Sequence, residues 1–353
     1  MSTDEYQDTG RWKRMPLKQR IKSNHNNGNG WERICIPVDN SEQSERAIDL
    51  GVRLAKHFNY SVSGIHVFNS ELHRKRFRSL IPHLPEKFRT RITEKMEKTH
   101  DAIMDLSFKH LGEELLDVIR FKAEKCGIEF ESKILDGNPA KEIENYVNQN
   151  GCGLVMMGSS GQGKSPRIGG CARKIARRIR KDIILVRDNI KEDVKIVVAI
   201  DGSDFSFSAL RKALLLAHCL KAELLAISVY DPNLHVTIFE SIKKVLTSQD
   251  EKLFNSKKQE NLHNEVIDNG IRKVYESALY RAECISLEVG KEIKTQVRAG
   301  IAFEKIIEFA QSEGASFLVF SRFGLHKALD SDIGSVAENL IVESPCNVLL
   351  CCN

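Results

Sequence analysis

The sequence predicts an α/β protein built from two tandem, doubly wound parallel sheets of five strands each, with long helical insertions. Short apolar runs alternate with longer segments of helical periodicity, which is typical of strands joined by crossover helices. This alternation occurs twice along the 353 residues. The two copies keep an almost constant spacing, because the offset from Asp39 to Asp201 nearly equals the offset from Gly161 to Gly324. A tandem duplication produces such a constant offset.

The first half begins with a short apolar strand, 34–38, that ends at Asp39. Ser41 is positioned to cap the next helix, 42–57, because a serine hydroxyl accepts from the open N–H groups of the first helical turn. Pro139 stands at the start of a later helix that extends to 149, a position where proline is well tolerated. The remaining strands are expected at 61–68, 128–135, 154–157 and 183–186, and the last helix at 172–181.

The second half repeats this order, with strands at 196–200, 222–229, 317–320 and 348–351 and a helix at 302–313 after Gly300. Each half carries a long helical insertion, 71–126 in the first and 230–290 in the second. We expect these insertions to cover a sheet edge or to contact the other half, a second chain or a protein partner. The predicted domains are 31–188 and 193–353, packed as a pseudo-dimer, and the polar residues 1–30 are predicted to form a mobile tail.

The composition is ordinary for a globular protein, at 41% hydrophobic and 29% charged residues. No apolar run approaches the ~20 residues that span a membrane, and no secretory signal is visible. Nine cysteines without framework spacing favour a reducing cytoplasm over disulfides. The net charge of +5 is small, and the basic run 164–181 lacks aromatic residues for base stacking, so nucleic acid is not an expected partner.

A glycine-rich loop follows the fourth strand of the first half. Its residues Gly158 to Ser165 match G-x-x-x-x-G-K-S, the phosphate loop of nucleoside triphosphatases. Glycine lets the backbone approach a phosphate, and a helix N-terminus offers unpaired N–H groups and partial positive charge. One hypothesis is therefore an ATPase that uses this loop.

The duplicate of the loop lacks the Gly-Lys-Ser signature. The two copies share Gly-x-x-Gly, with Ser in place of the first glycine in the second half, then a spacer of eight or nine residues and a glycine before the last helix. That glycine is Gly170 in the first half, followed by Cys171, and Gly334 in the second half, followed by Ser335. Pro166 also opposes the uninterrupted helix that a phosphate loop requires. We therefore interpret the match as a coincidence within the spacer and keep the ATPase as an alternative.

A strand that ends in Asp, a Gly-Asn-Pro helix start and the spaced glycines together resemble the universal stress protein family. The resemblance covers about 31–353 as two tandem domains and implies an adenine nucleotide alpha hydrolase-like fold. In the ATP-binding branch of that family, adenine lies near the Asp of the first strand, and ribose and phosphates lie on the glycine loop. The residues carried over as nucleotide-binding are Asp201, Val229, Ser321, Gly324, Gly334, Ser335 and Val336 in the second half, and Pro37, Asp39, Val67, Gly158, Gly161, Gly170 and Cys171 in the first.

The resemblance implies a non-enzymatic, cytoplasmic stress-response protein that binds ATP or another adenine nucleotide in at least one half, with Mg²⁺ as an additional ligand. Both halves depart from the family pattern. The first has one spacer residue fewer and Cys171 where Ser or Thr is expected, and the second has Ser321 in place of a glycine. Asp330 and Asp332 also bring negative charge near the phosphate position, which Mg²⁺ or Arg322 would have to compensate. A branch of the family binds no nucleotide, so an interaction scaffold is the other alternative.

Two further hypotheses rest on single residues. Cys171 lies at a predicted helix N-terminus near Lys164 and Arg167, features that lower the pKa of a thiol, and it is therefore a candidate redox-sensitive cysteine. His100 and Asp105 recur in the second half, at the offset of the duplication, as His263 and Asp268. Residues five apart on a helix do not share a face, so we interpret this pair as part of a packed helix and not as a metal or catalytic site.

Overall fold

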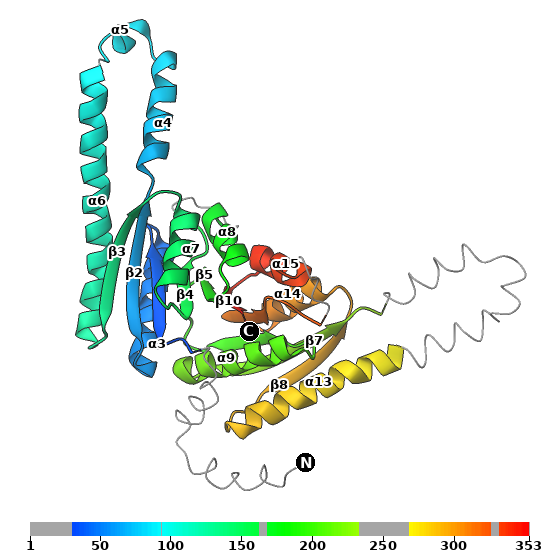
Figure 1. Ribbon diagram of the computed structural model, residues 1–353. Helices are drawn as coiled ribbons and strands as arrows, with labels where there is room; N and C mark the ends of the chain where they lie inside the picture. The colour runs from blue at the N-terminus through cyan, green and yellow to red at the C-terminus, as the bar shows by residue number, and fades with distance from the viewer. Residues whose placement is uncertain (1–29, 93, 162–167, 233–267, 326–331, 353) are drawn as a thin grey trace, which may run out of the picture. The chain divides into compact units, whose positions relative to one another are not determined.

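The computed structural model describes residues 30–92, 94–161, 168–232, 268–325 and 332–352. These residues belong to two compact units, one spanning Trp31–Asn189 and the other including Ile190–Asn353 (Figure 1). The predicted tail 1–30 lies outside the described residues except for Gly30, and so do residues 233–267, which include His263.

The first unit contains a parallel sheet of five strands in the order β3-β2-β1-β4-β5. The strands are β1 (Arg33–Val38), β2 (Ser61–Phe68), β3 (Phe130–Asp136), β4 (Leu154–Gly158) and β5 (Asp182–Val186). Helices α3 (Glu42–Phe58) and α6 (Glu94–Lys125) connect β1 to β2 and β2 to β3, and α7 (Pro139–Gln149) and α8 (Gly170–Arg178) connect β3 to β4 and β4 to β5. From β1 the chain adds β2 and β3 on one side, and it adds β4 and β5 on the other. Because the crossovers are right-handed, the helices of these two directions lie on opposite faces, which makes the sheet doubly wound.

The second unit repeats this topology, with strand order β10-β9-β6-β7-β8. Its strands are β6 (Lys195–Ala199), β7 (Glu223–Tyr230), β8 (Lys294–Ala299), β9 (Phe317–Ser321) and β10 (Asn347–Cys351). Its helices are α9 (Asp204–Leu220), α13 (Asp268–Glu288), α14 (Ala302–Ser312) and α15 (Ser335–Glu343). The predicted fold class of two doubly wound five-stranded sheets is therefore confirmed.

The same local signals start and end the first helix of each unit. The Ser41 hydroxyl caps α3 by accepting from the Ser44 N–H at 3.2 Å. The Ser203 hydroxyl caps α9 by accepting from the Ser206 N–H at 3.1 Å. The two helices end at left-handed residues, Asn59 with φ 59° and Lys221 with φ 55°. Capping of this kind satisfies N–H groups that the helix leaves open, and its repetition shows that the two halves share their chain turns as well as their strand order.

The insertion of the first unit forms a long helical hairpin. Helix α4 (Ser70–Leu80) leaves the sheet, the short helices η2 (Ile81–His83) and α5 (Glu86–Arg89) turn the chain, and α6 returns over 32 residues. Figure 1 shows α4 and the first part of α6 extending together past the ends of the strands. The His100 ring stacks on Phe77 at 4.2 Å and on His73 at 5.5 Å, so the interpretation of His100 as a residue of a packed helix agrees with its position.

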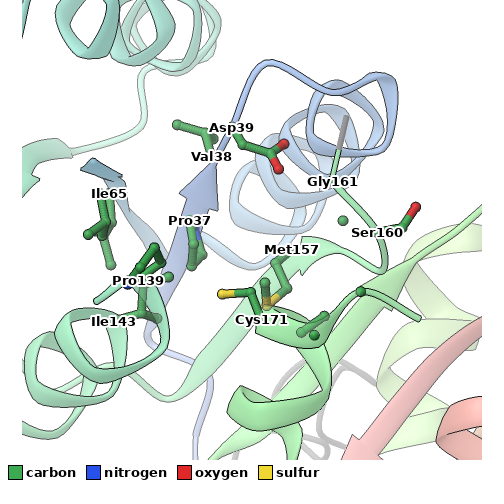
Figure 2. A pocket seen from close by; sticks show the side chains of 15 residues that line it. Pro37, Val38, Asp39, Ile65, Pro139, Ile143, Met157, Ser160, Gly161 and Cys171 are labelled. Atoms are coloured by element: carbon green, nitrogen blue, oxygen red, sulfur yellow. The ribbon is translucent and has the colours of Figure 1, made fainter. Parts of the chain in front are cut away.

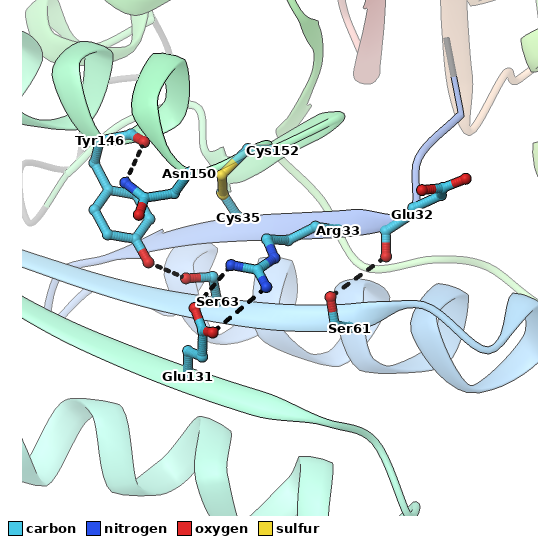
Figure 3. Close-up of a disulfide and its surroundings, with 9 residues drawn as sticks. All are labelled: Glu32, Arg33, Cys35, Ser61, Ser63, Glu131, Tyr146, Asn150 and Cys152. Carbon is cyan, nitrogen blue, oxygen red and sulfur yellow. Dashed lines mark hydrogen bonds and ion pairs between the residues drawn. A yellow bond between two sulfur atoms is a disulfide. The ribbon is translucent and has the colours of Figure 1, made fainter. Parts of the chain in front are cut away.

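One pair of cysteines contradicts the expectation that the thiols are all reduced. Cys35 and Cys152 form a disulfide, with their Cα atoms 6.0 Å apart and both side chains fully buried (Figure 3). Cys35 lies in β1 and pairs with Val155 of β4, and Cys152 lies just before that strand. The pair is 117 residues apart in sequence and is brought together by strand pairing, which cysteine spacing does not reveal.

We predict that this disulfide stabilises the first unit. Breaking it with a reductant should lower the free energy of unfolding by about 2–4 kcal/mol, because the crosslink restricts the unfolded chain over a long loop. Denaturant unfolding with and without reductant measures the change, and peptide mapping without reductant should recover Cys35 joined to Cys152. The variants Cys35→Ala and Cys152→Ala should each be less stable and insensitive to reductant. Equal stability of the wild type in both buffers would contradict the prediction.

Candidate functional site

Each unit has a cavity where the strand order reverses. The crossovers on either side of β1 and β4, and of β6 and β9, run in opposite directions, and a crevice opens at the carboxyl ends of such strand pairs. The cavity has a volume of about 300 Å³ in the first unit and about 330 Å³ in the second. These volumes lie at the lower end of the range for small-molecule pockets.

The cavity of the second unit is lined by all seven residues that the sequence assigned to a nucleotide site in that half. They come from the ends of β6, β7 and β9 and from the start of α15, so the fold brings together segments that lie far apart in the sequence. Their role toward a nucleotide stays a prediction. The seven residues are Asp201, Val229, Ser321, Gly324, Gly334, Ser335 and Val336.

Asp201 connects the end of the first strand to the loop after β9. Its Oδ1 accepts from the Ser203 N–H at 2.9 Å and from the Ser203 hydroxyl at 2.6 Å. Its Oδ2 accepts from the Leu325 N–H at 2.8 Å. One carboxylate thus holds both the turn before α9 and the glycine loop, and such charge-assisted bonds are stronger than neutral ones.

Gly324 leaves the space that this carboxylate fills. A Cβ at position 324 would lie 2.4 Å from the Asp201 Oδ2, well inside van der Waals contact. A Cβ at the corresponding Gly161 would lie 3.1 Å from the Asp39 Oδ2, which is tight but less severe. The second glycine of Gly-x-x-Gly therefore allows the loop to approach the strand-end aspartate, more closely in the second unit than in the first.

Helix α15 begins at the cavity. Gly334 is its N-cap, and the Gly334 N–H donates to the Arg322 carbonyl at 2.9 Å. Ser335 is the first helical residue, is exposed, and lines the cavity. The buried Arg322 also lines the cavity, and its Nη1 donates to the Asp332 carbonyl at 3.3 Å. A helix N-terminus with a hydroxyl and a nearby guanidinium is a suitable environment for an anionic group.

The cavity of the first unit is likewise lined by all seven residues that the sequence assigned to a nucleotide site in that half (Figure 2). Asp39 is the one charged residue in the described part of its lining, which is otherwise apolar or small. Met157 and Cys171 also line this cavity and contribute sulfur-containing side chains. The seven predicted residues are Pro37, Asp39, Val67, Gly158, Gly161, Gly170 and Cys171.

Within its described residues, the loop after β4 is bound to the start of α3. The Gln43 Oε1 accepts from the Ser160 N–H at 2.6 Å and from the Ser160 hydroxyl at 2.8 Å. Gly158 permits this approach, because a Cβ there would lie 3.0 Å from the Gln43 Cβ. In the second unit the equivalent Ser321 is tolerated, and its hydroxyl donates to the Phe323 carbonyl at 2.6 Å.

The start of α8 corrects the alignment of the two loops. The N-cap of α8 is Gly169, and its N–H donates to the Ser159 carbonyl at 2.7 Å, as Gly334 donates to Arg322 in the second unit. Gly169 therefore corresponds to Gly334, Gly170 corresponds to Ser335, and Cys171 corresponds to Val336. Seven residues separate Gly161 from Gly169 and nine separate Gly324 from Gly334. The first loop is thus two residues shorter, not one, and it has glycine where the second has the Ser335 hydroxyl.

The position of α8 also opposes a phosphate loop at Gly158 to Ser165. Residues Gly163, Lys164 and Ser165 lie outside the described residues, but Ile168 and Gly169 are not helical and the helix begins at Gly170. A phosphate loop places its Lys and Ser at the first turn of the helix. The helix here begins too late for that geometry.

The environment of Cys171 differs from the expectation of a lowered pKa. Burial raises the pKa of the Cys171 thiol, and the Asp39 carboxylate raises it further, while Lys174 acts in the opposite direction. The expected direction is therefore wrong. The sequence shows which basic residues lie near Cys171 on its own helix. It does not show that the thiol is buried or that Asp39, at the end of β1, lies near it.

Two polar side chains that line the second cavity, Tyr275 and Asp231, were not predicted from the sequence. Tyr275 of α13 lines the cavity, and its ring lies 6.0 Å from that of Tyr230. Burial raises the pKa of Tyr275, and the Asp201 carboxylate adds to this effect. Asp231 follows the end of β7 and also lines the cavity. Asp231 could have been predicted as a cavity residue, because the carboxyl ends of neighbouring parallel strands lie at the same edge of a sheet. Tyr275 could not, because it lies in a long insertion whose helical spacing predicted only a packed helix.

We predict that Cys171 reacts slowly with thiol reagents near neutral pH, because a raised pKa leaves little thiolate. Asp39→Asn should increase its labelling rate and Lys174→Gln should decrease it, since these changes lower and raise the thiol pKa respectively. Quantitative labelling followed by peptide mass spectrometry measures both, with the exposed Cys284 as the internal reference. Labelling of Cys171 faster than Cys284 would contradict the prediction.

Comparison with known proteins matches both halves of the chain to one family. The model of the universal stress protein family matches residues 30–187 and again 194–351. Universal stress protein YxiE of Bacillus subtilis is 25% identical over 159 residues, which cover 44% of this chain and 99% of that protein. Universal stress protein MJ0531 of Methanocaldococcus jannaschii is 27% identical over 169 residues, which cover 47% of this chain and 88% of that protein.

A solved structure has a similar fold over most of the chain. A universal stress protein from Archaeoglobus fulgidus matches with a TM-score of 0.56 at 15% identity, over 91% of this chain and 98% of that one. In the described part of this chain, no helix is both long and apolar enough to cross a membrane. The two family matches, together with the duplicated topology and loops, show that the chain belongs to the universal stress protein family as a tandem two-domain member.

Proposed function

We propose that the chain is a non-enzymatic regulatory protein of the stress response and that the cavity of its second unit binds an adenine nucleotide, with ATP as the first candidate. The observation that carries the proposal is the convergence of the seven predicted residues on one cavity at the switch point of the sheet. The family resemblance supplies the chemical class of the ligand. Mg²⁺ would accompany a triphosphate, and the described residues contain no cluster of His, Cys, Asp and Glu suited to a metal ion.

Three features favour the second unit over the first. Its loop keeps nine residues between Gly324 and Gly334, and Ser335 adds a hydroxyl at the helix start. Arg322 adds a cation to the cavity wall. The first unit has a loop two residues shorter and has Gly170 in place of the serine. The first unit stays a candidate for a ligand with fewer phosphates.

The proposal includes a cytoplasmic location and a protein partner that contacts the helical insertions. The Cys35–Cys152 disulfide is unusual for a reducing compartment, so fractionation of cells combined with thiol mapping is the appropriate test of location. A scaffold without any nucleotide is the main competing function, and it predicts that neither cavity binds ATP.

We predict that Gly324→Ala weakens ATP binding at least tenfold, or ~1.4 kcal/mol. The new methyl group would displace the Asp201 carboxylate and break its bond to the Leu325 N–H. The matched variant Gly161→Ala should change the affinity less than threefold, because the first unit is not the ATP site in this proposal. Isothermal titration calorimetry measures both. Loss of binding in Gly161→Ala with normal binding in Gly324→Ala would move the site to the first unit, and no binding by the wild type would reject the proposal.

We also predict that Tyr275 forms an aromatic wall of the nucleotide site. Tyr275→Ala should weaken ATP binding about tenfold, while Tyr275→Phe should stay within threefold of the wild type because the ring is retained. Tyr280 of the same helix is 68% exposed, so Tyr280→Ala is the matched control and should bind normally. Equal affinities for Tyr275→Ala and the wild type, in proteins of equal thermal stability, would exclude this role.

A further inference from the structure

Asp231 and Asn69 occupy equivalent positions in the two units. Each is the first residue after the second strand of its unit, which is β7 for Asp231 and β2 for Asn69. The Asn69 Oδ1 accepts from the Leu72 N–H at 2.8 Å and caps α4. Asp231 is exposed and lines the second cavity instead. The duplicated position therefore starts a helix in the first unit and faces the candidate site in the second.

Tyr275 and Gly112 are a second pair of equivalent residues, on α13 and α6. Both helices are followed by a left-handed glycine, Gly290 with φ 72° and Gly127 with φ 66°. Tyr275 and Gly112 each lie fifteen residues before that glycine. Tyr275 lines the second cavity, and α13 packs on β7 and β8 (Figure 1). The second unit thus has an aromatic ring at a position where the first unit has no side chain.

A change on the neighbouring strand accompanies this ring. His66 of β2 and Ser228 of β7 are equivalent, because each donates to a carbonyl at or just after the end of the first strand, at 3.0 and 2.5 Å respectively. A Cβ at Gly112 would lie 2.8 Å from the His66 ring. The first unit therefore has a ring on the strand and glycine on the helix, whereas the second has a small serine on the strand and Tyr275 on the helix.

The polar groups of the second cavity differ between its β9 side and its β7 side. Strands β9, β6 and β7 are neighbours in this order, and a spacing of about 4.8 Å between strands places β9 and β7 about 10 Å apart. The β9 side has the Arg322 guanidinium and the helix start at Ser335, which suit a phosphate. The β7 side has the Tyr275 ring and the Asp231 carboxylate, which accepts hydrogen bonds and donates none. The cavity therefore suits a ligand with an anion at one end and a planar hydrogen-bond donor at the other.

We propose that Asp231 and Tyr275 select the base of the nucleotide, with Tyr275 against the purine ring and the Asp231 carboxylate accepting from the 6-amino group of adenine. This inference rests on the proposed function of the second unit and adds the residue that distinguishes adenine from a purine with a 6-carbonyl. A carbonyl at that position cannot donate and would face the carboxylate as a second acceptor. Because Asp231 is exposed, water competes for the amine, and we expect a preference of about tenfold, well below the roughly 10⁴-fold preference that a buried site can reach.

The affinities of the full-length chain for ATP and inosine triphosphate (ITP) test this inference, because ITP has a carbonyl in place of the 6-amino group. Isothermal titration calorimetry should show that the wild type binds ATP at least tenfold more tightly than ITP. Asp231→Asn should reduce this ratio below threefold, because the amide can turn its oxygen to an amine or its nitrogen to a carbonyl. Asp193 is exposed just before β6, at the end of the strand opposite the cavity. Asp193→Asn removes the same charge and is the matched control, and its ratio should equal that of the wild type.

Three results would overturn the inference, and a fourth would also reject the nucleotide site. Equal wild-type affinities for ATP and ITP would overturn it and leave the proposed function intact. A preference for ATP that Asp231→Asn does not reduce would assign the selection to other residues. Guanine carries donors at N1 and at its 2-amino group that a carboxylate can accept, so tighter binding of GTP than of ATP would show that Asp231 selects guanine. A chain that binds none of the three nucleotides would reject the proposed function together with this inference.

Discussion

The contact between the aspartate at the end of the first strand and the second glycine of the loop shapes each candidate site. In the second unit, the Asp201 carboxylate accepts from both Ser203 and Leu325, and it occupies the space that a side chain at position 324 would need. The strand end, the helix N-terminus and the glycine loop are thereby held around one cavity. Because these hydrogen bonds fix the Asp201 carboxylate before a ligand binds, less conformational entropy is lost when the ligand binds.

The two units share this arrangement but have diverged in the parts that would contact a ligand. The first loop is two residues shorter and is held by Gln43, and its helix begins with Gly170. The second loop is longer, is held by Asp201, and leads to the Ser335 hydroxyl and the buried Arg322. Both keep a cavity at the same place in the fold, since that place is created by the strand order. Duplication thus provides two sites of the same origin whose chemistry differs.

Much of the fold could be predicted from the sequence because the apolar runs are short, regular and repeated. Ser41, Asn138 and Pro139 indicated the helix starts that the structure has, and Asp39 and Asp201 indicated the strand ends. The alignment of Gly170 with Gly334 failed because two adjacent glycines, Gly169 and Gly170, fit the pattern equally well and backbone hydrogen bonding distinguishes them. The Cys35–Cys152 disulfide and the raised pKa of Cys171 depend on residues brought together by strand pairing, which local sequence does not report.

We propose that the second unit holds one adenine nucleotide and that the first does not hold ATP. Native mass spectrometry of the intact chain, followed by denaturation and identification of the released small molecule, measures how many nucleotides are bound and which they are. We expect one adenine nucleotide per chain, either retained through purification or taken up when ATP is added. A chain that binds no adenine nucleotide at millimolar ATP would show that the second unit is not a nucleotide site.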